Sequence, residues 1–173
     1  MLEMIYHSKI GPLLLRSDGT YLTGVHFLME VERELPFIDL PIFRQTVQWL
    51  DLYFAGKEPD FMPSYKIEKS TPFRKRVLEI LATIPYGKTT TYKSIAEQIA
   101  KEWGLKRMSS QAVGGAVGWN PIGILIPCHR VLGANYALTG YAGGLEHKVE
   151  LLTLEGIDEK TLIYPKDWKK MTK

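Results

Sequence analysis

The chain has 173 residues, 45% of them hydrophobic and 24% charged, with a formal net charge of +3, a single cysteine and an N-terminus without a basic start. This length suits one large domain or two small ones of ordinary globular composition, and no apolar stretch approaches the roughly 20 residues of a membrane-spanning helix. We therefore expect no membrane partner, no secretory signal, no internal disulfide and no cysteine-rich zinc site, and a protein of the reducing cytoplasm.

The first third of the chain is typical of a small sheet followed by a helix. Residues 2–7, 13–17 and 21–27 are short runs rich in apolar and aromatic side chains, and Asp18-Gly19 between two of them is a strong hairpin signal. From residue 43 to residue 54 the apolar side chains recur at helical spacing. Residues 57–70 contain two prolines and no clear period, which indicates a linker.

The next segments predict a helix-turn-helix. A first helix opens at Thr71-Pro72, where Thr71 is a good N-cap and Pro72 suits the first helical position. After a short extended stretch, Ser94 is expected to cap a second helix that turns Trp103 inward. A tight turn follows, and Ser109 or Ser110 then opens a third helix that reaches about residue 117.

The last part predicts a wing and a closing helix. Residues 131–144 are rich in glycine and typical of a wing, and residues 145–155 form a helix with Gly156 past its end. We therefore expect an α/β (α+β) protein. Residues 1–65 would form an N-terminal sheet-plus-helix support domain, and residues 70–160 a helical winged-helix-like domain.

Basic residues gather in four places along the chain. The mild net charge permits nucleic-acid binding without requiring it, because such binding depends on clustered charge. A solvated surface is the ordinary interpretation of each group, and a phosphate-facing side is the alternative. The groups are Arg74-Lys75-Arg76, Lys88 with Lys93, Lys101 with Lys106 and Arg107, and Lys166 with Lys169, Lys170 and Lys173.

The residue best suited to carry out a reaction is Cys128, which follows an apolar run and precedes His129. A free cysteine most often acts as a small buried hydrophobe, whereas a reactive thiol needs a lowered pKa and access. The histidines at 7, 26 and 147 would ligate a metal only by converging in space, so we expect no metal site.

The surroundings of Cys128 carry a resemblance. The matching stretches are Asn120-Pro121, Pro127-Cys128-His129-Arg130-Val131 and Thr139-Gly140-Tyr141-Ala142-Gly143-Gly144, with Ala112-Val113-Gly114-Gly115-Ala116 and the Tyr92 segment upstream. Together they resemble the O6-alkylguanine-DNA alkyltransferase family. The resemblance covers residues 71–156 and its motifs are highly specific, whereas the N-terminal part matches only in size and general pattern.

The resemblance implies a DNA repair enzyme, a methylated-DNA--[protein]-cysteine S-methyltransferase. Cys128 would take an alkyl group from O6 of guanine in DNA once per molecule and without a cofactor, and O4-alkylthymine is a second candidate substrate. Displacement at carbon requires a thiolate. In the family the residue matching His129 removes the proton through a bridging water, and Glu155 matches the carboxylate that holds that histidine. Tyr92 matches the proton donor to the leaving guanine.

Other matching residues would bind the substrate or organise the site. Val131 would accept the exocyclic amine of guanine through its carbonyl, and Tyr141, Ala142 and Gly143 match the loop that lines the alkyl pocket. Asn120 matches an asparagine that hydrogen-bonds nearby backbone.

Several of these residues also have an ordinary structural interpretation. Glu155 lies at a helix C-terminus, where the macrodipole disfavours an acid by about 0.3–1 kcal/mol, and a solvated surface glutamate is the common outcome there. If Glu155 is instead a buried partner for an imidazole, its unfavourable position at the helix C-terminus is better explained. Tyr92 is a capping or core aromatic on sequence grounds, and Asn120 before Pro121 is typical of a turn.

The third helix presents small residues instead of the long forks that read base edges. Its paired glycines each destabilise the helix by roughly 1 kcal/mol relative to alanine. Their presence would be explained either by close packing of this helix on a neighbour or by close approach to a narrow DNA groove. In the family an arginine at the position of Gln111 enters the duplex to replace a flipped nucleotide; here glutamine keeps hydrogen bonding but lacks the charge. The expected DNA-binding residues are Lys106, Arg107, Ser109, Ser110, Gln111, Ala112, Gly114 and Gly115.

Three other functions are open to this sequence. The chain would be a sensor if it bound alkylated DNA without transferring the group, although relatives of that kind lack the cysteine. It would be a hydrolase if Cys128, His129 and Glu155 turned over small esters or amides. A transcription factor is disfavoured because the third helix has little with which to read bases. The expected partner is double-stranded DNA carrying alkylated bases, bound by a monomer.

Overall fold

The computed structural model describes residues 1–168 and divides them into two units. One unit contains Met1–Thr71 and Asn120–Ile126, and the other contains Pro72–Trp119 and the chain from Pro127 onward. Each contains helices and strands, so the expected mixed α/β class is confirmed. Lys169, Lys170 and Lys173 of the expected basic tail lie outside the described residues. Within residues 1–168, no helix is long and apolar enough to cross a membrane.

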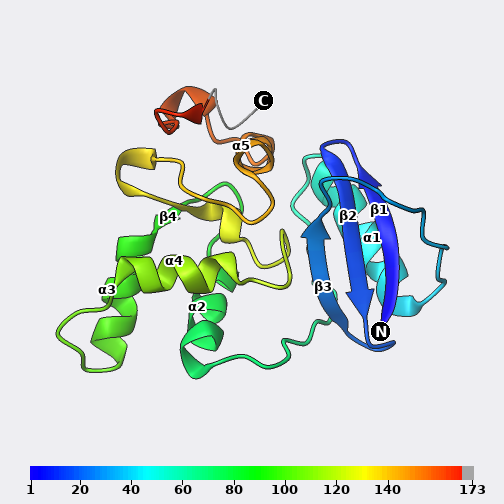
Figure 1. Ribbon diagram of the computed structural model, residues 1–173, viewed down its shortest axis with the longest axis horizontal. Helices are drawn as coiled ribbons and strands as arrows, with labels where there is room; N and C mark the ends of the chain where they lie inside the picture. Colours follow the sequence, from blue (N-terminus) through cyan, green and yellow to red (C-terminus); the bar gives the residue numbers. More distant parts are fainter. Residues whose placement is uncertain (169–173) are drawn as a thin grey trace. The chain divides into compact units, whose positions relative to one another are not determined.

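The N-terminal unit is an antiparallel sheet with one helix packed on it (Figure 1). The strands β1 (Leu2–Ser8), β2 (Gly11–Ser17) and β3 (Leu22–Phe27) pair in the order β1-β2-β3, and helix α1 (Pro41–Phe54) contacts β2. Alternate residues of β2 are buried, as the twofold period of a strand requires. The core of this unit includes Leu13, Leu15, Leu22, Val25, Phe43, Leu50 and Tyr53.

A short segment from later in the chain belongs to the same unit. The backbone N–H of Val25 donates to the carbonyl of Pro121 at 2.9 Å, and the N–H of Gly123 donates to the carbonyl of Val25 at 3.0 Å. A Cβ at Gly123 would lie 2.8 Å from the Val25 carbonyl oxygen, so this approach requires glycine. The expected second domain treats residues 70–160 as continuous, whereas here residues 120–126 extend the N-terminal sheet.

The C-terminal unit begins with three helices, in which α4 (Ser110–Gly118) packs against both α2 (Pro72–Ala82) and α3 (Tyr92–Glu102). The predicted cap of α3 is wrong. Thr91 is the N-cap and accepts a hydrogen bond from the backbone N–H of Ser94, because the helix starts three residues earlier than expected. Trp103 is 44% exposed instead of inward and rests edge-on against Phe73, because it follows the last turn of α3.

The second half of this unit links the helices to the cysteine. Cys128–Arg130 form a short 3-10 helix, η1, followed by β5 (Val131–Leu132), which pairs in parallel with β4 (Thr90–Thr91). Two further 3-10 helices, η2 (Ala134–Tyr136) and η3 (Glu159–Thr161), flank helix α5 (Leu145–Leu154). Because β4 leads directly into α3, the pairing holds the start of α3 close to η1. A second apolar cluster lies under α5 and consists of Leu132, Leu138, Leu145, Val149, Leu152 and Leu162.

Candidate active site

Cys128 is the first residue of η1 and is only 6% exposed. The Tyr141 hydroxyl is hydrogen-bonded with Cys128. Burial, followed by the effect of the nearby Cys128, raises the pKa of Tyr141 well above its ordinary value. This tyrosine therefore keeps its proton and donates to the sulfur, which is the arrangement that stabilises a thiolate.

His129 and Arg130, the two residues after the cysteine, both bind Glu155. His129 Nε2 lies 2.7 Å from Glu155 Oε1, while Arg130 Nε and Nη2 donate to Oε2 and Oε1 at 2.8 Å each. All three side chains are buried. Arg130 Nη1 also donates to the carbonyl of Ile84 at 2.6 Å. The expectation that Glu155 faces an imidazole is met by this contact, and Arg130 offsets the negative end of α5.

The charges of this network follow from burial and pairing. Burial raises the pKa of Glu155, but the hydrogen bonds from His129 and Arg130 outweigh it and hold the pKa at about 2. Burial lowers the pKa of His129, and the hydrogen bond to Glu155 only partly opposes this. The imidazole is therefore neutral at pH 7. Because an ionised carboxylate only accepts, Nε2 carries the hydrogen, and Nδ1 is the basic nitrogen.

The turn between α2 and β4 contacts Glu155 and the residue before it. The backbone N–H of Gly87 donates to Glu155 Oε2 at 3.2 Å, and the Tyr86 hydroxyl donates to the carbonyl of Leu154 at 3.4 Å. A Cβ at Gly87 would lie 2.9 Å from the Glu155 carbonyl oxygen, and Gly87 has φ +70°. Nothing in the sequence pattern indicates that this turn contacts Glu155. Its role at the carboxylate is visible only in the folded chain.

Tyr92 and Lys148 complete the surroundings of the cysteine. Tyr92, the first residue of α3, is hydrogen-bonded to Thr139; burial raises its pKa, the Thr139 bond opposes the shift, and the nearby Cys128 adds to it. Lys148 is fully buried, and burial lowers its pKa to about 8. Its Nζ donates to the carbonyl of Val131 at 2.7 Å. The carbonyl oxygen that is expected to accept the exocyclic amine of guanine therefore already accepts one hydrogen bond within the protein.

Asn120 lies in the other unit, where it is buried and bonded to backbone on both sides. Its Nδ2 donates to the carbonyl of Ile126 at 2.7 Å, and its Oδ1 accepts from the N–H of Ile122 at 3.0 Å. The side chain therefore closes the loop that leads into Pro127 and Cys128. Asn120 thus forms part of a turn and also hydrogen-bonds to nearby backbone, so the two interpretations of this residue are compatible.

Helix α4 presents a smooth exposed surface. Ser109 is its N-cap and accepts from the N–H of Ala112 at 3.2 Å. Gly114 lies beside the Tyr92 ring, where an added Cβ would make ordinary van der Waals contact at 3.8 Å, so close packing does not require this glycine. An added Cβ at Gly115 meets nothing within 4 Å, so packing does not account for that one. The exposed members of the expected DNA-binding set on this helix are Ser110, Gln111, Ala112 and Gly115.

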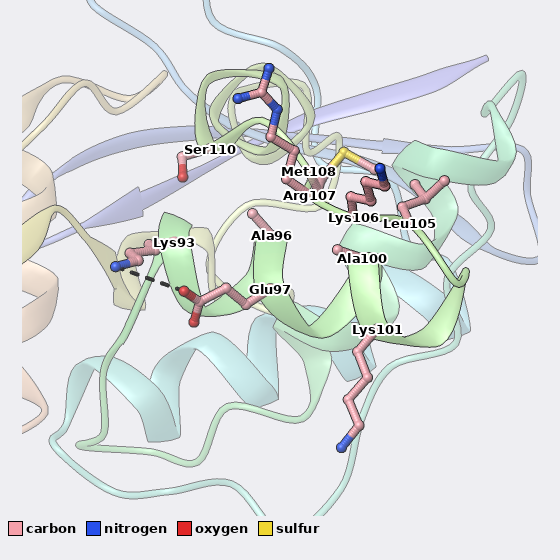
Figure 2. Close-up of a pocket in the computed structure, with 10 residues that line it drawn as sticks. All are labelled: Lys93, Ala96, Glu97, Ala100, Lys101, Leu105, Lys106, Arg107, Met108 and Ser110. Carbon is pink, nitrogen blue, oxygen red and sulfur yellow. Dashed lines mark ion pairs between the residues drawn. The ribbon is translucent and has the colours of Figure 1, made fainter.

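A groove runs beside α3 and the connection to α4 (Figure 2). Four basic residues line it: Lys93, Lys101, Lys106 and Arg107. Lys93 is paired with the groove's one acidic residue, Glu97, at 3.8 Å. Lys106 and Arg107 are exposed and precede the N-cap of α4, so this edge of the helix-turn-helix is positive.

Comparison with known proteins agrees with this geometry. Residues 1–62 match the ribonuclease-like domain of 6-O-methylguanine DNA methyltransferase, and residues 72–157 match its DNA binding domain. A methylated-DNA--protein-cysteine methyltransferase of Methanosarcina acetivorans is 42% identical over 164 residues, which cover 90% of this chain and 99% of that protein. The enzyme of the same name from Mycobacterium tuberculosis is 42% identical over 86% of this chain and 88% of its own length.

Solved structures give the same result. The crystal structure of Mycobacterium tuberculosis OGT in complex with DNA is similar with a TM-score of 0.74 and 38% identity, and the match covers 95% of this chain and 96% of that one. The O6-methylguanine DNA methyltransferase of Methanococcus jannaschii has a TM-score of 0.63 and 31% identity, over 90% of this chain and 94% of that one. Both domain models, the relatives and the fold agree, and the chain belongs to the O6-methylguanine DNA methyltransferase family.

Proposed function

We propose that this protein repairs DNA by moving the alkyl group of O6-alkylguanine onto Cys128. The observation that carries the proposal is the buried network in which Cys128 is followed by a neutral His129 held by Glu155. A neutral imidazole beside a thiol can take its proton, which is the first requirement of thiolate chemistry. The family to which the chain belongs supplies the substrate.

The reaction moves one proton to His129 and one alkyl group to sulfur. His129 Nδ1 takes the thiol proton through a bridging water, and Glu155 stabilises the imidazolium that results. The sulfur of Cys128 then bonds to the alkyl carbon as the bond from that carbon to guanine O6 breaks. The guanine takes a proton from the Tyr92 hydroxyl, which removes the negative charge of the leaving base. The backbone N–H of Ala142 contacts O6, beside Tyr141 and Gly143.

The product limits the protein to one reaction. A thioether has no good leaving group, and among the described residues Cys128 is the only cysteine, so a resolving thiol is not available in the chain. Each molecule therefore repairs one base. O4-alkylthymine presents the same kind of oxygen-bound alkyl group and is proposed as a second substrate.

Binding of DNA uses the smooth face of α4 and the positive edge before it. Guanine O6 lies inside the stack, so the nucleotide must be flipped at a cost of a few kcal/mol, which is lowest for a weakly paired damaged base. Small residues on α4 allow close approach to the minor groove, Lys106 and Arg107 contact phosphates, and Gln111 occupies the space of the flipped base. The protein is proposed to act as a monomer inside the cell, where it meets its DNA substrate.

Mass spectrometry of the protein mixed with duplex DNA containing one O6-methylguanine tests the proposal. The expected result is one methyl group on the Cys128 peptide, saturating at one per protein. Cys128→Ala is expected to gain no methyl group and to retain its affinity for DNA. Unmodified wild-type protein that remains bound to methylated DNA would identify a sensor instead. Turnover of small esters beyond one equivalent would identify a hydrolase.

A further inference from the structure

The loop from Thr139 to Gly144 forms one wall of the Cys128 site. Tyr141 is hydrogen-bonded with Cys128, and Thr139 is hydrogen-bonded with Tyr92. Tyr141 also packs against the apolar cluster under α5. The position of this loop therefore determines how much space lies in front of the sulfur.

The loop has little intrinsic rigidity. Three of its six residues are Gly140, Gly143 and Gly144, and Gly144 has φ +92°. Glycine has no Cβ and samples a wide range of backbone conformations, so a loop of this composition must be held by its contacts. Thr139, Gly140 and Ala142 are exposed, which leaves few neighbours to hold them.

The first turn of α5 holds the loop at both ends. His147 Nδ1 donates to the carbonyl of Gly143 at 2.5 Å. Lys148 Nζ donates to the carbonyl of Thr139 at 3.5 Å as well as to Val131. The N–H of Gly144 donates to the carbonyl of Tyr141 at 2.9 Å and closes the turn between these two anchors. Because a carbonyl only accepts, Nδ1 of His147 must carry the hydrogen in this contact.

We propose that His147 is a positioning residue that sets the size of alkyl group accepted at Cys128, by holding Gly143 against the start of α5. This inference rests on the proposed function, since it assigns a substrate preference to the same site. With the bond in place, the wall lies close to the sulfur and a methyl group is held in line for attack. Without it, the glycines let the wall move outward, so larger groups enter and a methyl group is held less well.

The test compares transfer from two duplexes of one sequence, one containing O6-methylguanine and the other O6-benzylguanine. In single-turnover experiments, His147→Leu is expected to lower the methyl rate constant about threefold to tenfold, the range for one neutral hydrogen bond. The benzyl rate constant is expected to fall less or to rise. The ratio of benzyl to methyl transfer therefore increases.

Two matched variants separate positioning from general damage. His147→Asn places an amide N–H where Nδ1 lies and is expected to restore the wild-type ratio. Glu146→Gln alters the exposed neighbour in the same turn and is expected to leave the ratio unchanged. A benzyl-to-methyl ratio within twofold of wild type in His147→Leu, or an equal increase in His147→Asn, would overturn the inference.

Failure of this inference is distinguishable from failure of the proposed function. Absence of methyl transfer by wild-type protein contradicts the proposed function itself. Normal transfer by wild type, combined with an unchanged ratio in His147→Leu, contradicts only the role of His147.

Discussion

Arg130 donates to both carboxylate oxygens of Glu155, with Nε and Nη2 each 2.8 Å from their acceptors. A bidentate guanidinium–carboxylate pair is among the strongest hydrogen-bonded contacts in proteins, and here both partners are buried. His129 binds the same carboxylate at Oε1. The imidazole therefore lies next to an ion pair instead of an isolated negative charge. As a result, burial lowers the pKa of His129 more than the carboxylate raises it, and the imidazole stays neutral.

Removal of the guanidinium is expected to destabilise the fold strongly. Arg130→Met leaves a buried carboxylate with the imidazole as its main partner, and breaking a buried pair from one side costs about 3–5 kcal/mol. The free energy of unfolding in urea measures this loss. Arg76→Met is the control, because Arg76 pairs with Glu102 at 2.7 Å on the surface, and an exposed pair contributes about 1 kcal/mol or less. Equal losses in the two variants would contradict a central role for the buried pair.

The Glu155 carboxylate makes stability depend on acid. Its pKa is about 2 in the folded protein and 4.5 in the reference state, so between these values the unfolded chain binds more protons. The contribution is fully present above pH 4.5 and is lost as the pH falls toward 2. Its size is on the order of 3 kcal/mol. Urea unfolding of wild type and Glu155→Gln from pH 6 to pH 3 should show the difference between them shrink as the pH falls.

Salt separates this effect from surface pairing. Glu102 also has its pKa lowered to about 2, by Arg76 and then Gln98, but it lies on the surface. Added sodium chloride screens exposed charges and should remove the pH-dependent difference between wild type and Glu102→Gln. The difference for Glu155→Gln should persist. A Glu155 effect that disappears in salt would mean that the carboxylate is solvated.

Gly87 is expected to tolerate no side chain. In Gly87→Ala the new Cβ meets the Glu155 carbonyl oxygen at 2.9 Å and the backbone stays left-handed, for a combined loss of about 3–4 kcal/mol. Thermal unfolding measures the change. Gly104→Ala is the control, because Gly104 has φ +65° but open space around its Cβ, so only about 1–2 kcal/mol should be lost. Similar losses in both variants would mean that the turn moves aside.

Gln111 is expected to limit the reaction on duplex DNA. Gln111→Arg should accelerate transfer from duplex O6-methylguanine about tenfold, because a charge-assisted hydrogen bond contributes about 1.5 kcal/mol. Transfer from the free base O6-benzylguanine should not change, since no nucleotide is flipped. Gln111→Lys adds the charge without the planar fork and should accelerate transfer less. An equal gain on free base and duplex would show that residue 111 does not act on DNA.

The sequence predicted most helices and strands because their signals are local. The period of buried residues in α1, Pro72 at the start of α2 and Gly156 after α5 each depend on neighbours within a few residues. The motif around Cys128 and its resemblance to a family were equally local and indicated the chemistry. The cap of α3 was misplaced because Thr91 and Ser94 are both good cap residues and lie only three residues apart, so local sequence does not choose between them.

Only the tertiary structure decided which distant residues share an environment. Glu155 has the helix position of a surface acid, and its burial follows from the packing of α5 against the turn at Gly87 and from the two donors on η1. Lys148 is a charged residue of a type usually exposed to solvent, yet it is buried because the carbonyls of Val131 and Thr139 accept from its Nζ and the Tyr92 ring lies beside it. Periodicity along a chain reports which face of an element is buried. It does not report what lies opposite, because that depends on how the elements pack.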